Sequence, residues 1–177
     1  MRAQPIIESG MKFDILEKEQ LFQIEHSDIH RKAGGGIKTV EFIYLTTDEN
    51  VLFIEAKKSC PNSANKNDSE DKQKKYEEYY SDITDKFVDS INMFSATVLG
   101  FNGQSDSVGE KFIQKRTYTG NKIKFVLVIA DAKESWLGGP RAELESRLLR
   151  YRKIWKADVL VLNPPMAVAL GFIESSS

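Results

Sequence analysis

Two neighbouring runs in the first half of the chain carry apolar residues in the pattern of β-strands. Residues 38–45 and 51–57 are rich in β-branched and aromatic side chains, and the polar segment 46–50 between them has the composition of a turn. The two runs predict antiparallel strands joined as a hairpin. Apolar residues occupy both faces of the second run until Glu55, as in a strand that is covered on both sides and ends in a cleft.

A long amphipathic helix is predicted for residues 71–99. Its apolar residues recur at steps of three and four, which is the spacing of one helix face. They are Tyr76, Tyr80, Ile83, Phe87, Ile91, Phe94 and Val98. We expect this stripe to pack on a sheet rather than to form an aromatic platform for nucleic-acid bases.

The last third of the chain has the pattern of a strand–helix–strand unit followed by a short helix. The expected elements are a buried strand at 123–130, a helix from Gly139–Pro140 to about 156, a strand at 157–162 and a helix at 166–173. The inner face of the first helix would consist of Leu144, Leu148, Tyr151 and Trp155. Two strands joined through a helix are parallel, so the sheet should be mixed, with a hairpin beside parallel strands.

The predicted class is therefore α/β (α+β), with a central mixed β-sheet flanked by helices. One domain is expected over residues 1–177, with its core at about 11–163 and a frayed end at 174–177. Hydrophobic residues make up 41% of the chain and charged residues 29%, as is typical of a globular protein.

Candidate chemistry lies at the end of the second predicted strand, in Glu55-Ala56-Lys57. Successive side chains of a strand alternate between faces, so Glu55 and Lys57 project from the same side. Glu41 lies on the neighbouring strand among apolar residues, where a charge is costly unless it is bound or paired. Two carboxylates beside an amine can hold a hard divalent cation for phosphodiester hydrolysis. The plainer alternative is an edge-strand charge at Glu41 and an ordinary ion pair between Glu55 and Lys57.

These residues resemble the PD-(D/E)xK nuclease superfamily, which has the restriction-endonuclease-like fold. The resemblance implies that Glu41 and Glu55 are metal-binding acids, that Lys57 is the catalytic lysine, and that the Ala56 carbonyl is a further ligand of Mg²⁺ or Mn²⁺. It also implies an additional acid from the N-terminal segment, for which Glu8 and Glu25 are the candidates. Glu25 has the better local pattern because it ends the strand-like run 21–25.

Two departures from the superfamily pattern bear on activity. Glu41 occupies a position usually held by aspartate, and Val40 precedes it where a proline would stand. A longer carboxylate can still reach a metal, but these changes are also compatible with a member that has lost catalysis.

The chain offers one basic segment for nucleic-acid phosphates. Net charge is only −1, so a binding face must be local, and Arg147, Arg150 and Lys153 in the second half of the predicted helix are the candidates. The alternative is that basic residues late in this helix simply complement its dipole. His26 and His30 are expected at the surface rather than as zinc ligands, because only Cys60 could add a soft ligand.

The expected function is a metal-dependent endonuclease or exonuclease that acts on DNA or RNA. A catalytically inert assembly subunit and a nucleic-acid binder that does not cleave are the alternatives. A cytoplasmic location is expected because no apolar run is long enough for a membrane span and the single cysteine, Cys60, suits a reducing compartment. A homodimer is expected if both strands of a duplex are cut.

Overall fold

The computed structural model describes residues 1–177 except 15, 104, 116, 117, 119–121, 172 and 174–177. The expected frayed end at 174–177 therefore lies outside the described residues. The strands are β1 Ile6–Glu8, β2 Met11–Phe13, β3 Leu21–Phe22, β4 Phe42–Leu45, β5 Val51–Lys57, β6 Ile123–Ile129 and β7 Asp158–Leu162. The helices are α1 Asp28–Ala33, α2 Glu70–Val98, α3 Glu110–Gln114, α4 Gly138–Arg147, α5 Leu149–Trp155 and α6 Pro164–Ala169, and short 3-10 turns cover Lys18–Gln20, Ser63–Asn65 and Glu134–Trp136.

A five-stranded mixed sheet with the order β3-β4-β5-β6-β7 is the centre of the molecule. β3, β4 and β5 are antiparallel neighbours, whereas β5, β6 and β7 are parallel. The sequence prediction of a mixed α/β sheet flanked by helices is thus confirmed. β5 lies in the middle, and its last residues, 55–57, pair with β6 beyond the point at which β4 begins.

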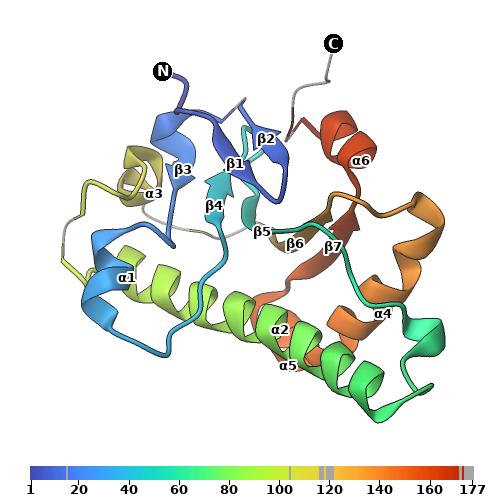
Figure 1. The fold of residues 1–177 in the computed structure, drawn as a ribbon. Helices are drawn as coiled ribbons and strands as arrows, with labels where there is room; N and C mark the ends of the chain where they lie inside the picture. Colours follow the sequence, from blue (N-terminus) through green and yellow to red (C-terminus); the bar gives the residue numbers. More distant parts are fainter. Residues whose placement is uncertain (15, 104, 116–117, 119–121, 172, 174–177) are drawn as a thin grey trace.

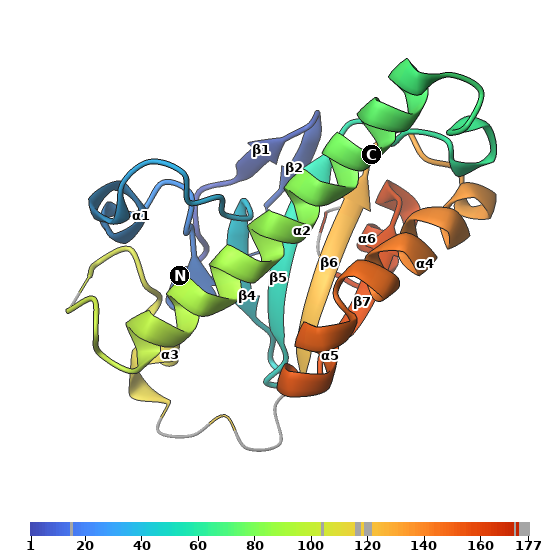
Figure 2. The same cartoon turned by 90° about the horizontal axis from the view of Figure 1, so that it is seen from below.

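Helices α2, α4 and α5 cover one face of the sheet, and the β1–β2 hairpin and α6 lie over the other face (Figures 1 and 2). The alternation of side chains in β5 divides its residues between two cores. Val51 and Phe53 pack toward α2, and Leu52 and Ile54 pack toward the hairpin. This is why the strand is apolar on both faces, as its sequence predicted.

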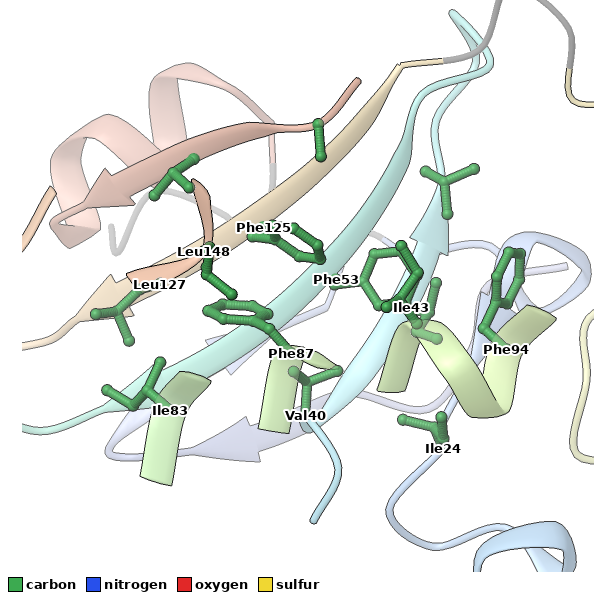
Figure 3. Packing of buried hydrophobic residues seen from close by; sticks show 14 of the residues in the cluster. Ile24, Val40, Ile43, Phe53, Ile83, Phe87, Phe94, Phe125, Leu127 and Leu148 are labelled. Atoms are coloured by element: carbon green, nitrogen blue, oxygen red, sulfur yellow. The ribbon is translucent and has the colours of Figure 1, made fainter. Parts of the chain in front are cut away.

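The α2 stripe packs on the sheet as predicted. Ser69 caps the helix by accepting a hydrogen bond from the Lys72 amide, and the helix then runs for 29 residues. Figure 3 shows Phe87 of α2 facing Phe125 and Leu148, and the ring centroids of Phe87 and Phe125 are 5.1 Å apart. The tilted contact of two aromatic rings is favourable beyond the area that it buries.

The first strand of the predicted hairpin is shorter than its sequence pattern. β4 begins at Phe42 instead of residue 38 because the preceding backbone bonds to α2. The amide of Lys38 donates to Asp89 Oδ2 (3.0 Å), and the amide of Val40 donates to Ser90 Oγ (2.8 Å). Glu41 therefore lies directly before β4, between the segment that is hydrogen-bonded to α2 and the strand itself.

Three other boundaries differ from the predictions. The expected strand at 21–25 stops at Phe22, because the Ile24 amide turns back to the Phe22 carbonyl (2.9 Å). The helix predicted from Gly139 to 156 is interrupted at Leu148 and forms α4 and α5, although Leu144 and Leu148 are buried on the inner face as expected. The last helix begins at Pro164 instead of 166, since the Asn163 side chain caps it and proline suits the first turn.

Gly109 should be intolerant of any side chain. A Cβ atom at this position would lie 2.6 Å from the Glu19 carbonyl oxygen and 2.8 Å from that of Leu21, and both are backbone atoms that cannot turn away. We expect Gly109→Ala to lower the free energy of unfolding by about 1–3 kcal/mol. Gly138→Ala is the control because its Cβ would meet nothing within 4 Å. Urea unfolding of both variants checks this, and equal stabilities would contradict the close approach.

Candidate active site

The pairing of β4 with β5 brings Glu41 and Glu55 face to face. Phe42 lies opposite Ile54 in this antiparallel register, so continuing it by one residue places Glu41 opposite Glu55. Glu41 is 9% exposed and Glu55 is completely buried. The structure therefore brings together the two acids that the sequence singled out.

Two ammonium groups bind the same oxygen of Glu55. Lys57 Nζ lies 2.9 Å from Glu55 Oε1, and Lys86 Nζ on α2 lies 2.8 Å from it. The other oxygen, Oε2, is buried and has no hydrogen-bond partner among the described residues. Burial raises the pKa of Glu55, and the charges of Lys86 and Lys57 oppose this shift. A buried carboxylate oxygen that accepts no hydrogen bond costs free energy of folding, and Oε2 is therefore a candidate ligand atom.

The surroundings of Glu41 favour the neutral form of its carboxyl group. Burial raises the pKa of Glu41 to about 9, and a hydrogen bond to Glu25 and the negative charge of Glu55 shift it in the same direction. These causes favour the neutral carboxyl of Glu41, whose Oε1 lies 3.8 Å from Lys86 Nζ. Carboxylates that are crowded in this way share protons because they cannot all be charged in a dry environment.

Glu8, Glu25 and His26 form a second group of candidate ligands beside Glu41. Their ligand atoms all lie within 4.8 Å of one another. Glu8 arrives from the end of β1, where Ser9 and Gly10 both have positive φ angles and form the tight turn of the β1–β2 hairpin. Glu8 and Glu25 were alternative candidates in the sequence, and the structure places both of them here. His26 is exposed, as expected of a surface histidine, and its ring lies beside these two acids.

The same hairpin turn contacts the Ala56 carbonyl. Ser9 Oγ donates a hydrogen bond to it at 3.1 Å. Ser9 would therefore have to share this oxygen if Ala56 served as a metal ligand.

Lys86 is the main site residue that sequence reasoning missed. It follows Ile83 by three positions and precedes Ser90 by four, so it belongs to the flank of the apolar stripe. Burial by itself would lower the pKa of Lys86, but the charges of Glu55 and Glu41 hold it above its ordinary value. Lys57 has a second contact on the outer side of the site, with Asp82 at 3.8 Å.

The basic residues predicted to bind phosphates line a shallow groove of about 540 Å³ on α4 and α5. Arg147 is already engaged in it, since it donates to Glu143 (2.7 Å) and to Glu77 of α2 (2.6 Å). Arg150 and Lys153 are exposed. The two latter residues are therefore better placed than Arg147 to meet an anion.

Comparisons with known proteins do not identify a family for this chain. No family model, no curated protein and no solved structure matches the chain. Among the described residues, no helix has the length and apolar character needed to cross a membrane.

Proposed function

We propose that this protein is a metal-dependent nuclease that hydrolyses phosphodiester bonds of nucleic acid, with DNA as the first substrate to test. Glu41 and Glu55 would hold Mg²⁺ or Mn²⁺, with Glu25 and Glu8 beside them, and Lys57 would face the reacting phosphate. The order of a hairpin that carries the acids, a long helix and a parallel strand supports the resemblance to the restriction-endonuclease-like fold.

The unbonded, buried oxygen Oε2 of Glu55 is the observation that carries this proposal. It is a buried carboxylate oxygen that no group in the described part of the chain contacts by a hydrogen bond, on a side chain fixed by two ammonium groups. The site as a whole holds the carboxylates of Glu8, Glu25, Glu41 and Glu55 against the amines of Lys57 and Lys86. With all four acids ionised, the four carboxylates and two ammonium groups leave a formal excess of two negative charges, which a divalent cation would neutralise. Carboxylate oxygens are the ligands that Mg²⁺ and Mn²⁺ prefer.

Each of the site residues would have a distinct role. A bound Mg²⁺ or Mn²⁺ would supply Lewis acidity and an activated water. Glu41 would give up its proton when the cation arrives, because the ionised carboxylate is the ligand. Lys57 is 27% exposed and held by Glu55, so its ammonium group can stabilise the extra negative charge on the phosphate in the transition state. Arg150 and Lys153 would bind the nucleic-acid backbone at a distance from the reaction.

The direct test is cleavage of labelled single- and double-stranded DNA and RNA by the purified protein with Mg²⁺ or Mn²⁺. Lys57→Ala should lower the cleavage rate by about 100-fold or more, since it removes a group that binds developing charge. Lys58→Ala is the matched control because Lys58 is the next residue along the chain and is exposed. It should cleave at the rate of the unaltered protein.

Two outcomes would overturn the proposal in different ways. Silence of the unaltered protein on every substrate, with both metals, would leave the inert assembly subunit as the better interpretation. Equal rates for the unaltered protein and for Lys57→Ala would exclude Lys57 from the chemistry.

A further inference from the structure

Lys86 occupies the space between the two carboxylates to which a metal ion is assigned. Its Nζ lies 2.8 Å from Glu55 Oε1 and 3.8 Å from Glu41 Oε1, and its side chain is only 15% exposed. Lys57 touches Glu55 as well, but its second carboxylate is Asp82 on the outer side. Within the described part of the chain, the ion pairs of Lys86 are the ones that join Glu41 to Glu55.

An ammonium group spaces these acids differently from a metal ion. Mg²⁺ binds oxygen at about 2.0–2.1 Å, so its ligand atoms lie close together. The ammonium group of Lys86 lies 2.8 Å from Glu55 and 3.8 Å from Glu41, and both distances are longer than a metal–oxygen bond. A metal ion bound to both acids would therefore hold their oxygens closer to itself than the ammonium group does.

We propose that Lys86 competes with the divalent cation for Glu41 and Glu55, and that it thereby sets the metal concentration at which the site fills. This inference rests on the proposed function and assigns a regulatory role to a residue outside the Glu41, Glu55 and Lys57 set. In the metal-free protein, the ammonium group of Lys86 contacts both acids. Once the metal binds, the ammonium group must either leave or remain beside a second cation.

Both ways of accommodating the metal weaken its binding. Leaving breaks the 2.8 Å contact with Glu55, and staying places a positive charge within a few ångströms of a doubly charged ion. Coulomb repulsion at such a distance is large wherever water is largely excluded. Glu55 Oε2 is the ligand atom that Lys86 leaves open, so the first metal contact would form there.

The experiment is calorimetric titration of the full chain with Mn²⁺. Lys86→Met removes the charge and keeps a side chain of similar length, and we expect it to bind Mn²⁺ about tenfold more tightly or better. Lys86→Arg keeps the charge and should bind like the unaltered protein. Lys72→Met is the matched control, because Lys72 is on the same helix, is 48% exposed and, among the described residues, forms its ion pair with Asp68 one helical turn away. Circular dichroism verifies that each variant is folded.

The outcomes separate this inference from the proposed function. Tighter binding by Lys86→Met alone supports the competition, including the case in which the unaltered protein binds no Mn²⁺. Unchanged or weaker binding by Lys86→Met overturns the competition but leaves a working metal site in place. Absence of Mn²⁺ binding in every variant overturns both proposals. Loss of folding in Lys86→Met would move the test to Lys86→Gln, which is judged by the same comparison.

Discussion

Replacing Glu55 by alanine is expected to abolish Mn²⁺ binding and to lower the free energy of unfolding by about 3 kcal/mol. Removing one partner of a buried ion pair costs about 3–5 kcal/mol because the other charge loses its compensation. The lower end applies here, since Lys57 and Lys86 are 27% and 15% exposed and Lys86 keeps its contact with Glu41. Metal binding should disappear because the open oxygen disappears with the side chain.

Urea unfolding and Mn²⁺ calorimetry measure the two effects. Glu78→Ala is the control, because Glu78 is 65% exposed and its partner Lys74 lies one helical turn away at 3.7 Å. Exposed pairs of this kind contribute little, so the control should stay within about 0.5 kcal/mol and bind Mn²⁺ normally. A Glu55→Ala variant that still binds Mn²⁺ would remove the basis of the proposed metal site.

The part of the site on β5 could be predicted because its signals are local. A strand turns successive side chains to opposite faces, so Glu55 and Lys57 had to share one side wherever the strand lay. The α2 stripe and the turn before β5 are local in the same sense. Their sequence patterns therefore gave the helix and the antiparallel hairpin correctly.

The rest of the site depends on contacts between distant segments. Lys86 looks like a surface lysine in the sequence, because periodicity does not tell which flank of a helix faces the strand ends. Glu8 ends β1 directly before the Ser9–Gly10 turn, and it lies close to Glu25 only in the folded chain. The signal in the sequence for this turn was a Ser-Gly pair between two short apolar runs. Arg147 was a candidate for binding nucleic-acid phosphates, and α2 supplies its partner Glu77 from 70 positions earlier in the chain.

The energetic state of the acids follows from the same long-range contacts. Glu41 was predicted in the middle of a strand. The hydrogen bonds of residues 38 and 40 to α2 instead delay the start of the strand until Phe42, and Glu41 lies close to Lys86. Burial beside Glu25 and Glu55 then favours the neutral carboxyl. The acids of the site are therefore arranged at the expense of stability, as is common where a ligand is to be bound.

Glu41→Gln is expected to stabilise the metal-free protein at alkaline pH and to abolish its stabilisation by Mn²⁺. The pKa of Glu41 is raised from 4.5 to about 9 in the folded chain, so the folded state binds a proton more tightly than the unfolded state. Its contribution to stability is complete below pH 4.5 and is lost as the pH rises toward 9. In this window the free energy of unfolding should fall by up to about 1.4 kcal/mol per pH unit for this group.

Other shifted groups do not reverse this slope. The raised pKa of Glu55 acts in the same direction. The lowered pKa values of Glu19 and Glu143 cost stability only as the pH falls below their ordinary value of 4.5. Glutamine imitates the protonated Glu41 at every pH, so the variant should show a shallower decline between pH 5 and 9 and greater stability at pH 9.

Urea unfolding at intervals between pH 5 and 9 tests this, with Glu78→Gln as the exposed control. At pH 8, Mn²⁺ should raise the unfolding temperature of the unaltered protein and of the control, because the cation binds the ionised acid and shifts the equilibrium toward the folded state. Glu41→Gln should show no such rise, since an amide is a poor substitute for a carboxylate ligand. Parallel pH profiles for the unaltered protein and Glu41→Gln would mean that Glu41 is ionised across the range. A rise with Mn²⁺ in Glu41→Gln would place the metal on other acids, with Glu8 and Glu25 the first to be replaced.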